Sequence, residues 1–242
     1  MIELAEKRWK SCIEKIEYAF QPIVNIHTGN AFAFEALLRN YREAGFESID
    51  ELFDQAWQED VLHHVDLELR KKALEKFAEY KQGRRIKLFY NLDNRLLCSS
   101  DYEPGQTIYA LEKFGYCLED LCFEISEKHD ISLTSSSIKT LSNYRSQGFK
   151  IAVDDCGTGF SGFQTLYYAE PDYIKIDRFF IQNMENDPKK RLLVATIVNM
   201  AHFMGSLVMA EGVETVDELT SCRNIGCDMV QGFFCPEANS EY

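Results

Sequence analysis

Short apolar runs alternate with amphipathic helical stretches along nearly the whole chain, and this alternation is the strongest constraint on the fold. Runs such as IKLFYN, LCFEIS and LVMAEG are apolar on both faces, which is typical of parallel strands that helices cover on both sides. About eight such β/α units favour an α/β fold, a TIM-type (β/α)8 barrel, over an open doubly wound sheet. No linker, repeat or low-complexity run interrupts the 242 residues, so we expect a single domain over residues 1–242.

Several of the intervening helices carry start signals in the sequence. A helix is expected over about residues 64–80, before Gly83. The expected starts of three others are a capping box at Ser48 and Glu51, an N-cap and first helical position at Asp187 and Pro188, and a second capping box at Thr215 and Glu218.

Composition narrows the class of function. The net charge of −13 argues against binding of DNA or RNA polymers through a basic face. A small phosphate diester remains possible where divalent cations reverse the local field. The eight cysteines show no zinc-site spacing, and no stretch has the length of a membrane span or the pattern of a signal peptide. We therefore expect a cytoplasmic protein with reduced cysteines.

Most of the strand-like runs lead into a polar residue that could hold a metal ion or a phosphate. In parallel barrels the carboxyl ends of the strands form the active site. Buried charges are normally paired, protonated or bound to a metal, so a ring of acids there points to a metal-dependent site. The residues concerned are Glu35, Asn91, Glu124, Asp154, Asp155, Lys175, Glu211 and Gln231.

Taken singly, several of these residues have a simpler structural interpretation. Glu35 could pair with Arg39 at the barrel rim, Asn91 could end a strand in a turn, and Glu124 and Glu127 could be solvated acids. Their joint occurrence at strand ends favours a functional site.

The adjacent pair Asp154 and Asp155 is a stronger signal. Two neighbouring carboxylates repel one another unless a cation lies between them, and one aspartate can bridge two metal ions about 4 Å apart. Lys175 lies in an apolar strand and must find a partner, either this acid cluster or Asp177.

Glu211 and Glu214 flank Gly212, so that one could bind metal while the other braces a loop or caps the next helix. The five histidines follow no strand-end pattern. Oxygen-rich ligation of this kind favours Mg²⁺ or Mn²⁺, with two ions per site, over zinc or copper.

The same residues carry a resemblance to a known family. FQPIVNIHTG, EALLR at 35–39, FYNLD, FEISE, DDCGTGF, YIKID, AEGVET and QGFF follow one another along the chain. In this content and order the chain resembles the EAL domain, the phosphodiesterase that cleaves cyclic di-GMP, over about residues 18–236.

The resemblance implies a barrel with one antiparallel strand that hydrolyses cyclic di-GMP to linear pGpG. It also implies a role for each matching residue. The first metal would be held by Glu35, Asn91, Glu124 and Asp154, and the second by Asp154, Asp155 and Glu211. Lys175 would contact the attacking water, and Arg39 would bind a substrate phosphate. Gln231 would support the site on the substrate side, and the nearby loops would be stabilised by Glu127 and Glu214.

The resemblance further implies that the DDCGTGF loop couples a homodimer to activity. Here Cys156 and Gly162 replace the family's usual Phe and Ser, and the change makes the loop less bulky. The sequence stops soon after Pro236, where many relatives continue, so we expect a fragment of a larger regulator with an additional regulatory domain.

Two other functions remain to be weighed. EAL-like domains that have lost catalytic groups act as cyclic di-GMP receptors, and a third possibility is a scaffold that binds no nucleotide. A receptor has no physical need for the complete acid set, so the sequence favours the enzyme.

Overall fold

The computed structural model describes residues 2–81, 86–98, 105–126, 134–158 and 162–232, with side chains from residue 7 onward. Eight strands form a closed barrel in chain order. They are β1 (Glu17–Asn25), β2 (Ala31–Arg39), β3 (Lys87–Asn91), β4 (Leu121–Ser126), β5 (Lys150–Cys156), β6 (Tyr173–Ile176), β7 (Leu207–Ala210) and β8 (Met229–Val230).

Strand β1 runs against the other seven strands. It pairs antiparallel with both β2 and β8, whereas every other neighbouring pair is parallel. Antiparallel neighbours can be joined by a short turn, and only five residues separate β1 from β2 in the sequence. The predicted α/β barrel with one antiparallel strand is confirmed.

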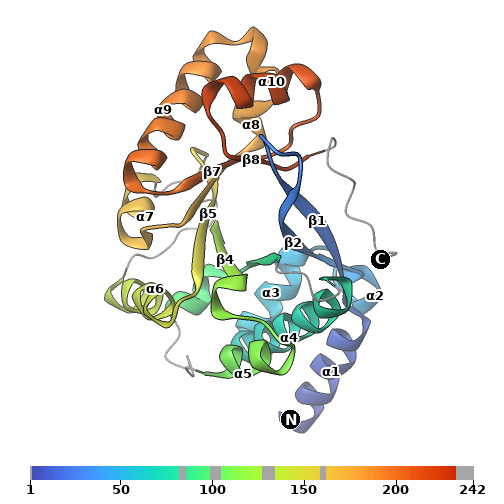
Figure 1. Ribbon diagram of the computed structural model, residues 1–242. Coiled ribbons are helices and arrows are strands. Elements are labelled where there is room, and N and C mark those ends of the chain that lie inside the picture. The colour runs from blue at the N-terminus through green and yellow to red at the C-terminus, as the bar shows by residue number, and fades with distance from the viewer. Residues whose placement is uncertain (1, 82–85, 99–104, 127–133, 159–161, 233–242) are drawn as a thin grey trace.

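Helices surround the barrel, as Figure 1 shows, with α3 to α5 on one side and α8 to α10 on the opposite side. The α-helices are α1 (Ile2–Lys15), α2 (Tyr41–Ala44), α3 (Ile49–Gln58), α4 (Leu62–Lys81), α5 (Gln106–Lys113), α6 (Ser135–Gln147), α7 (Gly162–Ala169), α8 (Arg178–Ile181), α9 (Pro188–Met204) and α10 (Val216–Ile225). The described residues also include the short 3₁₀ helices η1 (Asn94–Cys98), η2 (Leu118–Asp120) and η3 (Met184–Asn186). Within the described ranges, no helix combines the length and apolar character needed to cross a membrane.

The helix starts largely follow the sequence signals. Asp187 caps α9 with Pro188 in its first turn, Thr215 and Glu218 form a capping box on α10, and the helix expected over 64–80 is α4. Of the two hydrogen bonds of the capping box predicted at Ser48, only one forms. Ser48 accepts from the Glu51 N–H, but the Glu51 carboxylate accepts from Glu47 N–H, one residue before the cap.

The inside of the barrel is closed by one apolar layer. Every strand contributes one inward-facing side chain to it, and most are fully buried, so this layer is a packed floor and not a pore. Its members are Ile23, Ala33, Phe89, Cys122, Ala152, Tyr173, Met209 and Met229. A larger apolar core fills the space between the strands and the helices.

Candidate active site

A polar layer lies directly above the apolar floor. Side chains two positions apart in a strand face the same way, so the next inward-facing residue of each strand stands one level higher. From β1 to β8 these residues are Gln21, Glu35, Asn91, Glu124, Asp154, Lys175, Glu211 and Gln231, of which Glu211 and Gln231 directly follow the last residues of β7 and β8. Because β1 runs in the opposite direction, Gln21 precedes its floor residue, and it lies opposite Glu35 in the β1–β2 register.

The expectation that all these residues sit at strand ends needs correction. Glu35 is the fifth of nine residues of β2, and Glu124 lies two residues before the end of β4. Strands of unequal length pass the same level of the barrel at different points. The shared property of these residues is therefore their level above the floor.

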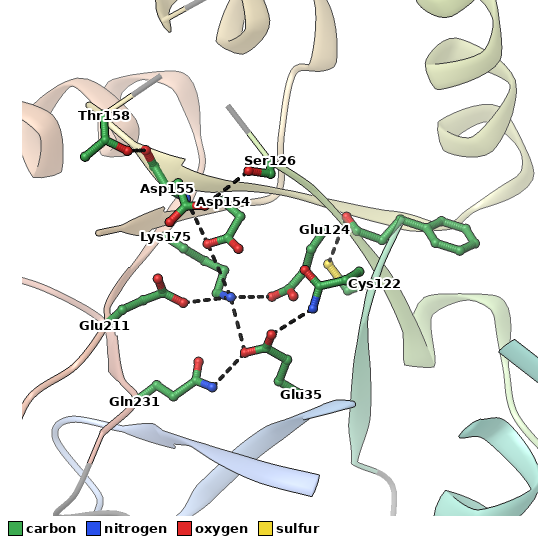
Figure 2. A network of polar contacts seen from close by, with 12 residues as sticks. Glu35, Cys122, Glu124, Ser126, Asp154, Asp155, Thr158, Lys175, Glu211 and Gln231 are labelled. Carbon is green, nitrogen blue, oxygen red and sulfur yellow. Dashed lines mark hydrogen bonds and ion pairs between the residues drawn. The ribbon is translucent and has the colours of Figure 1, made fainter. Parts of the chain in front are cut away.

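Lys175 occupies the centre of this layer (Figure 2). Its Nζ lies 2.7 Å from Glu211 Oε1, 2.8 Å from Glu124 Oε1, 3.3 Å from Glu35 Oε2 and 3.4 Å from Asp154 Oδ1. The lysine side chain is 1% exposed. One ammonium group thus holds together acids from four other strands or strand ends.

Two amides hold the Glu35 carboxylate from the other side. Asn91 Nδ2 donates to Glu35 Oε1 at 2.8 Å, and Gln231 Nε2 donates to Glu35 Oε2 at 2.7 Å. Burial acts to raise the pKa of Glu35, but Lys175 and the two amides outweigh it and lower that pKa. Glu35 therefore remains ionised in the site.

The ionised forms of the other acids of the cluster are less stabilised than that of Glu35, and their pKa values are raised. Burial raises the pKa of Glu124 well above its ordinary value, and the neighbouring Glu35 charge adds to the effect. Burial also raises the pKa of Asp154, and raises the pKa of Glu211 to about 8 even though Lys175 opposes the shift. The four carboxylates raise the pKa of Lys175, which remains protonated despite its burial. Four carboxylates thus share one ammonium group, and the raised pKa values of three of them mean that all four cannot favourably be ionised together without a further cation.

The donor set fits divalent cations. Carboxylate oxygens of Asp154, Asp155 and Glu211 lie within 4.8 Å of one another. Glu124 Oε2 is buried with no hydrogen-bond partner among the described residues. Hard oxygen donors of this kind are the ligands that Mg²⁺ and Mn²⁺ prefer, and a cation would satisfy the oxygens that Lys175 does not reach.

A cavity of about 390 Å³ opens over one side of the acid cluster. Its lining includes Gln21, Glu35, Arg178, Glu211, Gly212, Glu214, Gln231 and Gly232. Arg178 pairs with Glu214, with Nη2 2.7 Å from Oε1. Its stem crosses Gly212 so closely that a Cβ there would lie 2.5 Å from Arg178 Cγ, so only glycine fits under this arginine.

The sequence also names Arg39, Asp177 and Glu127 as candidates near this site. Arg39, last in β2, faces the same way as Glu35 by strand alternation, and its guanidinium donates to Leu38 O at 3.0 Å. Glu35 therefore pairs with Lys175, and its suggested partner Arg39 is engaged elsewhere. Asp177, the alternative partner of Lys175, caps α8 by accepting from Phe179 N–H. Glu127 lies outside the described residues.

The two substitutions in the DDCGTGF region fall in regular structure. Cys156 is the last residue of β5 and is buried in the core between strands and helices. It is thus a core residue, and the expectation that it thins a loop is corrected. Gly162 is the first residue of α7. Residues 159–161, between the two, lie outside the described part of the chain.

Sequence reasoning missed three residues of the site. Gln21 completes the polar layer, Arg178 lines the cavity, and Ser126 donates to Asp155. The signal for Gln21 was its spacing of two from Ile23 in an alternating strand. Ser126 stands two residues after Glu124 in β4, but a hydroxyl at that position carries no charge to attract notice.

Comparisons with known proteins identify the family of the chain. The family model described as "EAL domain" matches residues 11–238. The chain is 32% identical over 222 residues to an uncharacterized protein of Azorhizobium caulinodans, covering 88% of this chain and 30% of that protein. It is 28% identical over 234 residues to the cyclic di-GMP phosphodiesterase RocR of Pseudomonas aeruginosa, covering 90% of this chain and 56% of RocR.

Solved structures show the same barrel. The Klebsiella pneumoniae protein BlrP1, in a complex with calcium and cyclic di-GMP, matches with a TM-score of 0.80 and 29% identity. That match covers 90% of this chain and 54% of BlrP1. The chain therefore spans only part of the length of these relatives, from under a third to just over half.

Proposed function

The chain belongs to the EAL domain family, and from that premise we propose that it is a metal-dependent phosphodiesterase that hydrolyses cyclic di-GMP to linear pGpG and so lowers this messenger in bacterial signalling. RocR carries the name of such an enzyme, and BlrP1 has been solved with the dinucleotide. The observation that carries the proposal is the acid cluster around Lys175, because four carboxylates share this single buried ammonium group.

We propose two cation positions, with the ligands that the family resemblance implies. The first comprises Glu35, Asn91, Glu124 and Asp154, and the second comprises Asp154, Asp155 and Glu211, with Asp154 shared. The mutual proximity of carboxylate oxygens from the last three residues supports the second position. The cations would be Mg²⁺ or Mn²⁺. When bound, they would supply Lewis acidity to the attacking water and to the phosphoryl oxygens.

The protein's own residues position the reacting groups. Lys175 is kept protonated and donates toward the acid ring, so it can orient a water molecule held in that ring and stabilise phosphate charge. Gln231 fixes Glu35 from the side of the cavity that would admit the substrate. Arg39, two positions along β2 from the inward-facing Leu37, stands above Glu35 as a candidate phosphate ligand.

The setting of this activity is part of the same proposal. We place the protein in the cytoplasm and propose that it forms a homodimer. The loop after β5 would couple the dimer to the active site, and the neighbouring loops would be stabilised by Glu127 and Glu214. The greater length of the relatives supports an additional regulatory domain beside this barrel.

A chromatographic assay of purified protein with cyclic di-GMP tests the proposal. We expect pGpG to appear with Mg²⁺ or Mn²⁺ and not with a chelator. Glu35→Ala should abolish turnover because it removes a charge that both Lys175 and the two amides hold in place. Glu68→Ala is a matched control, since Glu68 is a half-exposed acid on α4 that pairs with Lys71.

The alternative is a receptor that binds the dinucleotide without cleaving it. Intact substrate under every metal condition, with binding still detectable, would assign the chain to that class. The complete acid ring favours the enzyme, because binding alone does not require several buried carboxylates around one lysine.

A further inference from the structure

Two consecutive aspartates reach the same site, which a regular strand does not allow. In β5 the floor residue Ala152 and then Asp154 face inward, so alternation would direct Asp155 outward. Asp155 can nevertheless reach the site because its backbone is in the left-handed conformation, with a φ of 58°. At the same place, the β5–β6 register shifts between Val153 and Cys156. The result is that oxygens of Asp154, Asp155 and Glu211 lie within 4.8 Å of one another.

This backbone conformation carries an energetic cost. A non-glycine residue is disfavoured in the left-handed region, because its Cβ crowds the following carbonyl oxygen. Asp and Asn tolerate the left-handed region better than most residues, but such a backbone conformation persists only where surrounding contacts stabilise it. The contacts that hold Asp155 in this turn are therefore part of the site.

Ser126 holds the Asp155 side chain. Its Oγ donates to Asp155 Oδ2 at 3.1 Å, as Figure 2 shows. Ser126 is the last residue of β4 and faces inward by its spacing from Cys122 and Glu124, directly across the register from Asp154. The serine is thus placed at the level just above the polar layer.

The position of Ser126 is itself fixed. Asn94, the first residue of η1, donates from Nδ2 to the Ser126 carbonyl at 2.8 Å. On the other side, the Asp155 carbonyl accepts from Thr158 Oγ1 at 2.9 Å and from Thr158 N–H at 3.1 Å. Side chain and backbone of Asp155 are therefore held by separate partners.

We propose that Ser126 is a positioning residue for the second cation, an inference that rests on the proposed two-cation function. Its hydroxyl holds the Asp155 carboxylate in the orientation that brings it to Asp154 and Glu211. A carboxylate can accept one hydrogen bond and still offer an oxygen to a cation, and such outer hydrogen bonds typically change metal affinity roughly 10- to 100-fold. Ser126 contacts neither substrate nor cation in this role.

Mn²⁺ binding without substrate tests this role, followed by calorimetry and by electron paramagnetic resonance. We expect the wild-type protein to bind two Mn²⁺ ions, and Ser126→Ala to weaken only the second by roughly 10- to 100-fold. Ser126→Thr is the matched control, because it keeps the hydroxyl and should retain both affinities. In turnover assays, Ser126→Ala should need correspondingly more Mn²⁺ for half-maximal rate, with the same rate at saturation.

The outcomes separate this inference from the proposed function. Two unchanged Mn²⁺ affinities in Ser126→Ala would overturn the role of Ser126 while leaving the enzyme in place, and so would equal weakening of both ions, which indicates a general structural defect. If the wild type binds two Mn²⁺ ions but never cleaves cyclic di-GMP, the proposed activity fails. A selective loss of the second ion in Ser126→Ala would still support the positioning role in that case.

Discussion

At the residue scale, Lys175 lies at the centre of a ring of acids. Its ammonium contacts four carboxylates at 2.7 to 3.4 Å. A buried ion cluster of this kind is weak evidence for stability, because desolvation offsets the Coulomb energy. Removing one partner is different, since the remaining buried charges then have no compensation.

Lys175→Met should destabilise the metal-free protein by roughly 3 kcal/mol, the lower end of the cost of breaking a buried ion pair. Methionine fills a similar volume but leaves Glu35, Glu124, Asp154 and Glu211 without their common cation. Urea unfolding in the presence of a chelator measures the change. Saturating Mg²⁺ should recover part of the loss, and equal losses with and without Mg²⁺ would contradict a shared cation site.

The left-handed turn at Asp155 gives a second prediction at this scale. Asp155→Gly and Asp155→Ala both remove the carboxylate, but only glycine adopts a φ of 58° without steric cost. We expect the glycine variant to be more stable than the alanine variant by about 1 kcal/mol in urea unfolding with chelator. Equal stabilities would mean that the backbone leaves the left-handed region once the carboxylate is gone.

Sequence reasoning at the residue scale found the acids, Lys175 and the amides Asn91 and Gln231, but missed three residues of the site: Gln21, Ser126 and Arg178. A buried acid stands out because burial is costly for it, whereas Gln21 and Ser126 look like ordinary strand residues. Alternation places Asp154 in the barrel but predicts the wrong side for Asp155. The left-handed turn depends on contacts with Ser126 and Thr158, which the sequence does not display.

At the element scale, the alternation of apolar runs and amphipathic stretches was sufficient to predict the barrel. The direction of β1 was not available from periodicity, because an antiparallel strand buried on both faces has the same pattern as a parallel one. Helix α1 was also not predicted. It lies outside the barrel against α2 and α4 (Figure 1), and its docking depends on tertiary contacts.

Helix α1 is attached through Trp9 and Glu59. Trp9 is 2% exposed, stacks on Phe46 with ring centroids 5.8 Å apart, and donates from Nε1 to Glu59 Oε2 at 2.8 Å. Arg8 Nη1 adds a contact of 2.6 Å to Glu59 Oε1. Glu59 directly follows α3, so this carboxylate joins the first helix to the barrel's outer layer.

The contacts of Glu59 predict that the free energy of unfolding depends on pH. The hydrogen bond from Trp9, and then Arg8, lower the pKa of Glu59 in the folded protein. A lowered folded pKa gives stability that is present above the ordinary value of about 4.5 and is lost as pH falls through the folded value. The urea midpoint of the wild type should therefore exceed that of Glu59→Gln at pH 6, and the two should converge toward pH 3.

A matched variant distinguishes this contact from general charge effects. Glu68→Gln removes a negative charge from α4 at a side chain that is 39% exposed and pairs with Lys71. We expect its midpoint to follow the wild type across the same pH range. A constant gap between wild type and Glu59→Gln from pH 6 to pH 3 would show that the Glu59 charge does not hold α1.

At the scale of the whole molecule, the polar layer joins distant parts of the chain. Lys175 and Glu35 are 140 residues apart, and Gln231 and Glu35 are 196 residues apart. Each strand contributes to the same ring, so a ligand of the ring stabilises the closed barrel and not a local segment. Any cation that binds the folded protein alone must raise its stability by mass action.

Mg²⁺ or Mn²⁺ should accordingly raise the free energy of unfolding. At a cation concentration of about 100 times the dissociation constant, the expected gain is about 2.7 kcal/mol for one site. Thermal unfolding with a chelator and with increasing Mn²⁺ measures it. Asp154→Asn should reduce the gain most, because Asp154 is assigned to both cation positions and contacts Lys175. An unchanged melting temperature across the titration would contradict cation binding in this ring.

Ca²⁺ separates stabilisation from catalysis in the same molecule. It takes six to eight oxygen ligands in a flexible geometry, whereas Mg²⁺ demands near-octahedral coordination. The acid ring offers oxygens that Ca²⁺ also accepts, and BlrP1 has been solved with calcium and cyclic di-GMP. We therefore expect excess Ca²⁺ to raise the melting temperature of this protein but to inhibit pGpG formation, because a larger ion would place the acids and Lys175 too far from the reacting phosphate. Hydrolysis that continues unchanged with excess Ca²⁺ would show that tight coordination is not needed for the reaction.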